Sequence, residues 1–273
     1  MPCNCCEMEN NTFGEDEAKS NLKDYRKRGP ANQTKLILEA VRSLGLKNAA
    51  LLDIGGGIGT IHHELLKDVA REATHVDASS AYLKVATEEA KRVGHEAQVK
   101  FIHADFTDVA NELPQVDVVT LDRVVCCYPN MRALLKAASS KSRTAIAMTY
   151  PRDVWWTRAA VKVANFFQGL GKDPFRVFVH SVSEMEALLK VEGLQRVSTR
   201  RLFVWEMSLY QRSYGGMASR PTLQVRSLGM PFRGLLVGVR GVQHFGISPG
   251  FRDDLQTDGQ TCFRESAGDG DGG

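Results

Sequence analysis

Residues 52–59 of this 273-residue chain read Leu-Asp-Ile-Gly-Gly-Gly-Ile-Gly and continue an apolar run that starts at residue 49. Glycines allow a sharp backbone turn and let a ligand come close, because no Cβ blocks its approach. The next segment, residues 61–70, has the apolar spacing of a helix. A strand, a glycine turn and a helix in this order predict the ligand-binding end of a parallel α/β unit.

The same alternation of strand-like and helix-like segments continues on both sides of this turn. Strands alternating with helices imply parallel βαβ units, and buried parallel strands are expected to be continuous apolar runs. We predict strands at residues 49–54, 74–77, 99–103, 116–121 and 144–149, and helices at 34–44, 61–70, 81–93, 131–139 and 183–191. Residues 195–212 have no helical spacing and fit an antiparallel strand pair joined near residues 204–206.

Composition divides the chain into three parts. Residues 1–30 are polar and rich in charge, and we expect a flexible segment in which residues 21–29 could fold over a ligand, with Tyr25 lining the site. Residues 31–212 hold the periodic segments and form the predicted domain. Residues 213–273 are rich in glycine, end in Ser-Ala-Gly-Asp-Gly-Asp-Gly-Gly and are expected to be disordered.

Charge and hydropathy exclude several classes of protein. The formal charge of +3 gives no reason to expect a nucleic-acid partner. No apolar stretch has the length of a membrane span, and the N-terminus does not resemble a secretory signal, so we expect a cytoplasmic protein. Cys3, Cys5 and Cys6 could bind a soft metal, but their spacing matches no structural zinc pattern, and we predict no metal site. The sequence does not indicate an oligomeric state.

The acid beside the glycine turn indicates the charge of the ligand. A dinucleotide site has the spacing Gly-x-Gly-x-x-Gly, whereas here Gly55, Gly57 and Gly59 alternate and Thr60 stands at the third glycine position. Asp53 lies two residues before Gly55, where a negative charge opposes pyrophosphate and favours a cationic ligand such as S-adenosylmethionine. A nicotinamide oxidoreductase remains an alternative, if Thr60 replaces the glycine.

Two further acids follow the next two predicted strands. Asp77 ends the second strand, where a carboxylate can accept two hydrogen bonds from a ribose diol. Asp105 follows the third strand and could accept a hydrogen bond from an adenine amino group, with Phe106 against the ring face. Each acid alone could be only a helix cap, but together they predict a cofactor site at the carboxyl edge of the sheet.

At these residues the chain resembles the class I S-adenosylmethionine-dependent methyltransferases over about residues 30–212. This resemblance implies a doubly wound, mostly parallel, seven-stranded α/β sheet (a Rossmann-like methyltransferase fold) with an antiparallel last strand. Within the family, the chain is most similar to the magnesium-protoporphyrin O-methyltransferases and their relatives. The similar residues are Leu121-Asp122, Tyr128-Pro129, His180-Ser181 with Glu184, and Ser208-Leu209-Tyr210.

The chain departs from the porphyrin enzymes at two positions. Cys127 stands where they have a histidine before Tyr-Pro, and Phe13 stands where they have a tyrosine before glycine. We assign Asp122 to the cofactor site, and we take Arg123, Tyr128 and His180 as the candidate catalytic residues. Arg123 could pair with a substrate carboxylate, and Tyr128 could donate a hydrogen bond to the acceptor.

The aromatic segment at residues 150–178 could form a wall for an apolar acceptor or a peripheral contact with a membrane. We therefore expect an S-adenosylmethionine-dependent methyltransferase that acts on a small molecule of aromatic or apolar character, most simply at an oxygen atom. A non-catalytic module of the same fold that binds the cofactor for assembly or regulation is the alternative.

Overall fold

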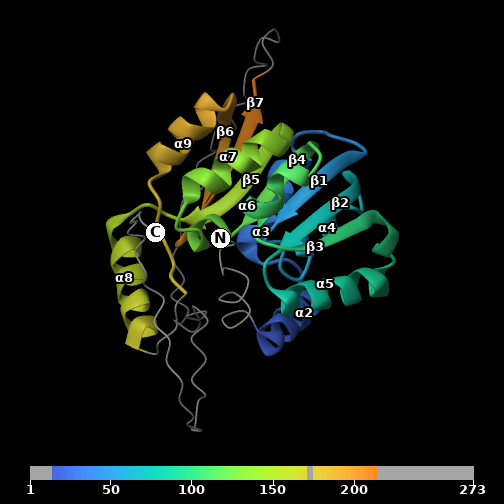
Figure 1. The fold of residues 1–273 in the computed structure, drawn as a ribbon, viewed down its shortest axis with the longest axis horizontal. Coiled ribbons are helices and arrows are strands. Elements are labelled where there is room, and N and C mark those ends of the chain that lie inside the picture. The colour runs from blue at the N-terminus through green and yellow to red at the C-terminus, as the bar shows by residue number, and fades with distance from the viewer. Residues whose placement is uncertain (1–13, 171–174, 214–273) are drawn as a thin grey trace, which may run out of the picture. The chain divides into compact units, whose positions relative to one another are not determined.

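A seven-stranded sheet in the order β3-β2-β1-β4-β5-β7-β6 organises the chain in this computed structural model (Figure 1). The structure describes residues 14–170 and 175–213. The strands are β1 (Ala49–Ile54), β2 (Ala70–Asp77), β3 (Val99–His103), β4 (Val116–Asp122), β5 (Ser142–Pro151), β6 (Leu194–Arg201) and β7 (Trp205–Arg212). The first five are parallel, and β7 is antiparallel to both of its neighbours. The predicted fold class is confirmed.

Helices cover both faces of the sheet. Helices α3 (Asn32–Arg42), α4 (Thr60–Leu65) and α5 (Ser80–Val93) lie on one face, and α6 (Phe106–Val109), α7 (Met131–Lys141) and α9 (Val182–Val191) lie on the other. Helix α2 (Glu15–Arg28) packs on α5, and α8 (Trp155–Leu170) follows β5. Three short 3-10 turns complete the described elements: η1 (Glu96–Gln98), η2 (Ala110–Glu112) and η3 (Val125–Cys127).

Alternation along the central strands builds a separate apolar core on each face. Leu51 and Val118 pack with Ile37 of α3 and Leu65 of α4. Their chain neighbours Leu52 and Val119 belong to the other core, together with α6 and α7. Successive side chains of a strand point to opposite faces, so each central strand contributes to both cores.

The boundary between the first helix and the second strand differs from the prediction. The helix expected at residues 61–70 ends at Leu65, and β2 begins at Ala70 instead of residue 74. The Val69 N–H donates to Leu65 O at 2.8 Å, and the Ala49 N–H donates to Val69 O at 3.0 Å. This turn places the chain beside β1 before residue 74, so residues 70–73 belong to β2 although Arg71 and Glu72 interrupt any apolar pattern.

The strand pair expected at residues 195–212 is present as β6 and β7, joined by residues 202–204. Ser181 caps the last described helix, because its Oγ accepts the Glu184 N–H.

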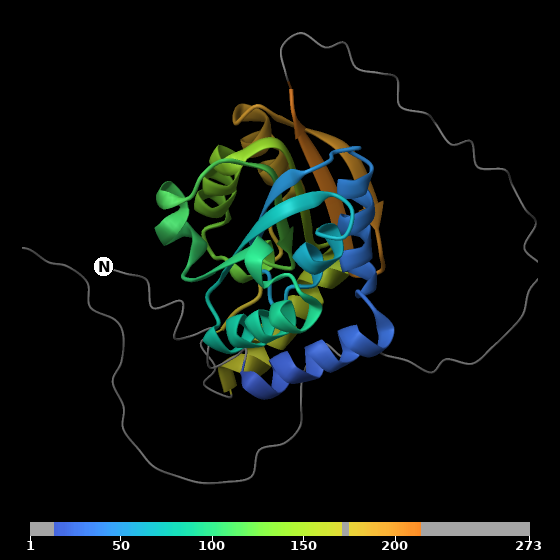
Figure 2. The same cartoon turned by 90° about the vertical axis from the view of Figure 1, so that its right-hand side faces the viewer.

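Helix α2 occupies residues for which a flexible segment was expected. Ala18 and Leu22 are buried against Ile58, Tyr82 and Val85. Figure 2 shows α2 lying alongside α5. The order of this segment therefore comes from tertiary packing, which its polar composition does not show. Residues 1–13 and 214–273, including nearly all of the expected glycine-rich tail, lie outside the described residues.

None of the described helices combines the length and the apolar composition needed to cross a lipid bilayer.

Candidate functional site

The loop after β1 requires glycine at alternating positions. Gly55, Gly57 and Gly59 have φ values of +58°, +57° and +85°, a left-handed conformation that strains residues with a Cβ. A Cβ on Gly55 would also lie 2.5 Å from Cγ2 of Val124. The loop thus presents backbone, without side chains at these positions, at the carboxyl edge of the sheet.

Asp77 is fixed to this loop from the end of β2. Its Oδ2 accepts the Gly57 N–H and its Oδ1 accepts the Ser79 N–H, both at 2.8 Å. Burial raises the pKa of Asp77 to about 6, against the lowering effect of these two donors, so the carboxylate is mainly ionised at neutral pH. Each oxygen keeps a second acceptor position.

Asp53 does not lie where the sequence analysis placed it. In the sheet it is opposite His75 of β2 and Thr120 of β4, so its side chain points to the face that carries α3 and α4. Oδ1 accepts the Thr120 hydroxyl at 2.7 Å, and Oδ2 lies 3.4 Å from His62 Nδ1. The side chain is only 1% exposed, and burial raises its pKa to about 6. The expected direct contact with a cationic ligand is therefore corrected: the pleat of β1 turns this carboxylate into the interior.

Asp105 and Phe106 also have internal roles. Asp105 caps α6: its Oδ1 accepts both the N–H and the hydroxyl of Thr107 at 2.8 Å. Phe106 is 1% exposed and belongs to the core under α6 and α7. The expected stacking of Phe106 on an adenine ring does not fit this position, because the first turn of α6 directs the ring into the core.

Asp122 closes the end of β4 with bonds to two hydroxyls. Oδ2 accepts from Thr34 of α3, and Oδ1 accepts from Thr149 of β5. The carboxylate thereby ties three elements together near the glycine loop. It is brought to the same edge of the sheet as Asp77, with a small exposed fraction of its own.

Arg123 turns the chain after β4 with a left-handed φ of +63°. Burial raises the pKa of Glu17 on α2 and of Tyr82 on α5. The nearby Arg123 guanidinium opposes the rise in both groups. The Arg123 side chain is half-exposed. The charge therefore lies on the α2 and α5 side of the loop.

Tyr128 and His180 are brought together by the segment before α9. His180 Nε2 donates to the Tyr128 carbonyl at 3.0 Å, and its ring stacks on Phe178. The Tyr128 hydroxyl donates to Asp105 Oδ1 at 2.7 Å. Burial lowers the pKa of His180. The histidine thus holds the backbone of the loop that carries Tyr128.

The sequence analysis missed a group of histidines packed against the glycine loop. His62 and His63 begin α4, His75 lies on β2, and all three are almost completely buried. Burial lowers the pKa of each to about 3, so all three are neutral. The register of β2 against β1 would have placed His75 beside Asp53, had the strand boundary been known.

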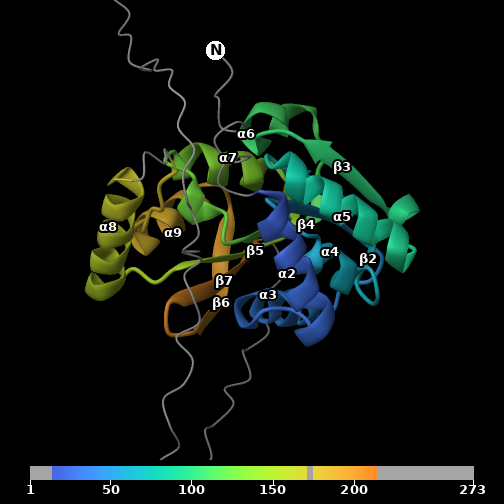
Figure 3. The same cartoon turned by 90° about the horizontal axis from the view of Figure 1, so that it is seen from below.

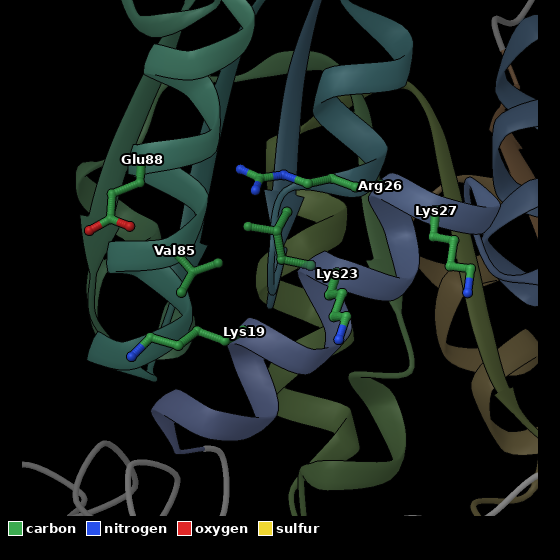
Figure 4. A pocket seen from close by; sticks show the side chains of 7 residues that line it. Lys19, Lys23, Arg26, Lys27, Val85 and Glu88 are labelled. Carbon is green, nitrogen blue, oxygen red and sulfur yellow. The ribbon is translucent and has the colours of Figure 1, made fainter.

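An open groove between α2 and α5 is lined by mostly basic side chains and by Glu88 (Figure 4). Its lining residues are Lys19, Leu22, Lys23, Arg26, Lys27, Val85 and Glu88. Lys19 pairs with Glu15 and Arg26 pairs with Glu89. No residue of the glycine loop lines the groove, which separates it from the candidate site.

Comparison with known proteins was made on both sequence and structure. Residues 51–143 match a family described as a methyltransferase domain. The ubiquinone/menaquinone biosynthesis C-methyltransferase UbiE of Rhizobium meliloti is 27% identical over 183 residues, covering 59% of this chain and 70% of that protein.

Two solved structures illustrate the similarity of fold. Magnesium protoporphyrin IX methyltransferase (ChlM) of Synechocystis, with bound SAH, has a TM-score of 0.57 at 17% identity and covers 74% of this chain and 100% of that chain. An O-methyltransferase family protein of Burkholderia thailandensis has a TM-score of 0.59 at 15% identity, covering 77% of this chain and 62% of that chain. The matched domain contains the glycine loop, Asp77 and Tyr128.

Proposed function

We propose that this chain is a class I, S-adenosylmethionine-dependent methyltransferase and that it methylates a small apolar or aromatic acceptor at an oxygen atom, a proposal supported by the matched methyltransferase domain and the similar fold. The observation that carries the proposal is the bond between Asp77 and the Gly57 N–H. It fixes an ionised carboxylate beside a loop from which side chains are sterically excluded.

The residues present fit the cofactor. After accepting one N–H each, the two oxygens of Asp77 can each accept one hydroxyl, as a ribose diol requires. The left-handed glycines leave backbone groups open to a ligand at the same edge. Asp122 and Asp105 would support this site by fixing the surrounding loops.

When bound, S-adenosylmethionine supplies a methyl group activated by the neighbouring sulfonium. The protein then has to align an acceptor and exclude water. Arg123 could hold an anionic acceptor as a charge-assisted pair. Tyr128, held by Asp105 and by His180, would fix the loop on the acceptor side.

The placement of Tyr128 and His180 supports an oxygen acceptor. Tyr128 donates to Asp105, and His180 donates to a carbonyl, so neither is set up to remove a proton. A carboxylate is already ionised at neutral pH and needs no such base. The exposed aromatic side chains of α8, such as Trp155 at 80% and Phe166 at 64%, support an acceptor with apolar surface.

A second candidate is a module that binds the cofactor without transferring its methyl group. Cys127 favours it, because this side chain replaces the histidine of the porphyrin enzymes and its Sγ donates to the Arg123 carbonyl at 3.4 Å. A thiol in this bond holds the turn and offers no strong base to a substrate.

Calorimetric titration with S-adenosylhomocysteine tests the cofactor site. We expect Asp77→Ala to weaken binding by about 1–3 kcal/mol, because it removes charge-assisted hydrogen bonds. Asp68→Ala, which removes an exposed acid paired with Arg42, should leave the affinity unchanged. Equal affinity in the two variants would remove Asp77 from the site.

Transfer of a labelled methyl group to aromatic and aliphatic carboxylic acids then tests the reaction. An alkali-labile methyl ester in the product supports transfer to a carboxylate oxygen, whereas a label stable to alkali contradicts it. Binding of the cofactor without transfer to any acceptor would favour the non-catalytic module.

A further inference from the structure

Three potential metal ligands meet behind the glycine loop, outside the residues used above for cofactor binding and transfer. Asp53 comes from β1, His75 from β2 and His62 from α4. Each offers a ligand atom, and these atoms all lie within 4.8 Å of one another. His75 and His62 are 0% exposed and Asp53 is 1% exposed. Three separate elements thus deliver their donors to one enclosed point.

Two of the three separations between the donors match those of a tetrahedral metal site, and the third is within 4.8 Å. His75 Nδ1 lies 3.3 Å from His62 Nδ1, which lies 3.4 Å from Asp53 Oδ2. With metal–ligand distances of about 2.0–2.2 Å, the ligands of a tetrahedral ion are about 3.3–3.6 Å apart. The two separations therefore need almost no adjustment to accept an ion.

One of the proposed ligand atoms lacks a hydrogen-bond partner. Asp53 Oδ2 is buried without one in the described part of the chain. A buried acceptor without a partner is costly, and a carboxylate oxygen more so than a neutral group. A cation at this point would give Asp53 Oδ2 the partner that it lacks.

The backbone of the glycine loop comes close to the cluster at Gly56. A Cβ on Gly56 would lie 2.6 Å from His75 Nδ1 and 2.9 Å from Asp53 Oδ2. Two of the three donors therefore border the space that any side chain at this position would fill.

We propose that Asp53, His62 and His75 bind a divalent transition-metal ion of the zinc class. Two imidazoles and a carboxylate suit zinc and its neighbours, whereas magnesium and calcium prefer oxygen ligands alone. The ion would tie β1, β2 and α4 together behind the loop and fix its backbone. This assignment replaces the sequence-based prediction of no metal site, and it does not depend on methyl transfer.

Metal content of the full-length protein, without an affinity tag, tests the proposal. The protein is stripped with a chelator, loaded with zinc, dialysed against metal-free buffer and analysed by mass spectrometry. We expect the wild type to retain one more zinc ion per chain than His62→Asn/His75→Asn. The cysteines can also bind zinc, but they are the same in both proteins and cancel in the difference. His103→Asn, outside the cluster, is the matched control and should retain as much zinc as the wild type.

Two further measurements cover the case in which the double variant does not fold. Cobalt-loaded wild type should show the visible bands of a tetrahedral nitrogen and oxygen site, in addition to any thiolate bands. Gly56→Ala keeps all three ligands but fills the space beside them, and it should lose the same bands. Equal zinc content in folded wild type and double variant, or cobalt bands of thiolate origin alone, would overturn the proposal and leave a metal-free hydrogen-bonded cluster.

Discussion

Two regions of the molecule differ in how their side chains meet solvent: the glycine-loop region around β1 and β2, and helix α8. Around β1 and β2, acids and histidines are buried and bonded to one another or to backbone N–H groups. Beyond β5, helix α8 carries large apolar side chains in solvent, and it lies far from α5 (Figure 3). The glycine-loop region fixes a loop in one conformation, whereas α8 leaves apolar surface available. A rigid loop would suit the binding of a cofactor, which is always the same, whereas exposed apolar surface would suit the selection of a methyl acceptor.

The largest loss of stability is expected in the glycine loop, at Gly55, where a side chain has least space. Gly55→Ala should lower the free energy of unfolding by about 2–4 kcal/mol, because it combines a left-handed residue with overpacking against Val124. Gly45→Ala is the control, since Gly45 has a similar φ of +67° and nothing within 4 Å of its Cβ position. Urea denaturation measures both. Equal losses of unfolding free energy in the two variants would show that the loop rearranges to accommodate the alanine side chain at position 55.

A smaller loss of stability is expected at the contact between Arg26 of α2 and Glu89 of α5. Glu89 is buried and accepts from Arg92 and Arg26, and these bonds lower its pKa to about 2. We expect Glu89→Gln to cost about 1–2 kcal/mol at neutral pH.

This contribution has a defined pH dependence. A carboxylate with a lowered folded-state pKa stabilises the protein above its unfolded value, near 4.5, and the stabilisation is lost as the pH falls toward 2. Denaturation between pH 6 and pH 2 should therefore bring wild type and Glu89→Gln together. Glu88→Gln, at the exposed neighbouring position, should show no such convergence. A constant difference across this range would contradict the assigned role.

The bond between Tyr128 and Asp105 joins the loop after β4 to the end of β3. Tyr128→Phe should cost about 0.5–1.5 kcal/mol of stability and lower kcat for methyl transfer. Tyr210→Phe serves as the control, since its buried hydroxyl has no partner among the described residues and its loss should not destabilise the protein. An unchanged kcat in Tyr128→Phe would limit this residue to a structural role.

The smallest change in stability is expected on α8. Phe166→Ser/Phe167→Ser should alter the free energy of unfolding by no more than about 0.5 kcal/mol, because both rings are exposed. If α8 contacts the acceptor, KM should rise by about tenfold, the loss expected for about 1–2 kcal/mol of apolar contact. Affinity for S-adenosylhomocysteine should stay constant, and Lys162→Ser should leave both quantities unchanged. A weaker affinity for S-adenosylhomocysteine would place α8 at the other end of the site.

The centre of the sheet could be predicted because the strands β1, β4 and β5 are buried on both faces. Runs such as residues 116–121 contain mainly apolar, β-branched side chains, and the glycine turn marks the point where the first strand ends. Asp77 could be singled out as a candidate because it ends the second predicted strand, at the carboxyl edge of the sheet. The antiparallel pair at residues 194–212 was found from the lack of any helical spacing.

The parts that could not be predicted depend on contacts between distant residues. Asp53 was placed by its position beside a glycine turn, but the face to which it points depends on the pleat and on its pairing with Thr120. His62 and His75 are thirteen positions apart, and only the register of β2 brings their Nδ1 atoms within 3.3 Å. Helix α2 owes its order to Tyr82 and Val85, which the polar sequence of residues 15–28 does not reveal.

The position of β7 also has a consequence for synthesis on the ribosome. This strand lies between β5 and β6, although it is made after both of them. Until Arg212 has left the exit tunnel, β5 keeps an unpaired edge, and β6 has no strand beside it. The nascent chain must therefore protect the edge of β5 from other chains from the time that Pro151 leaves the tunnel until Arg212 does.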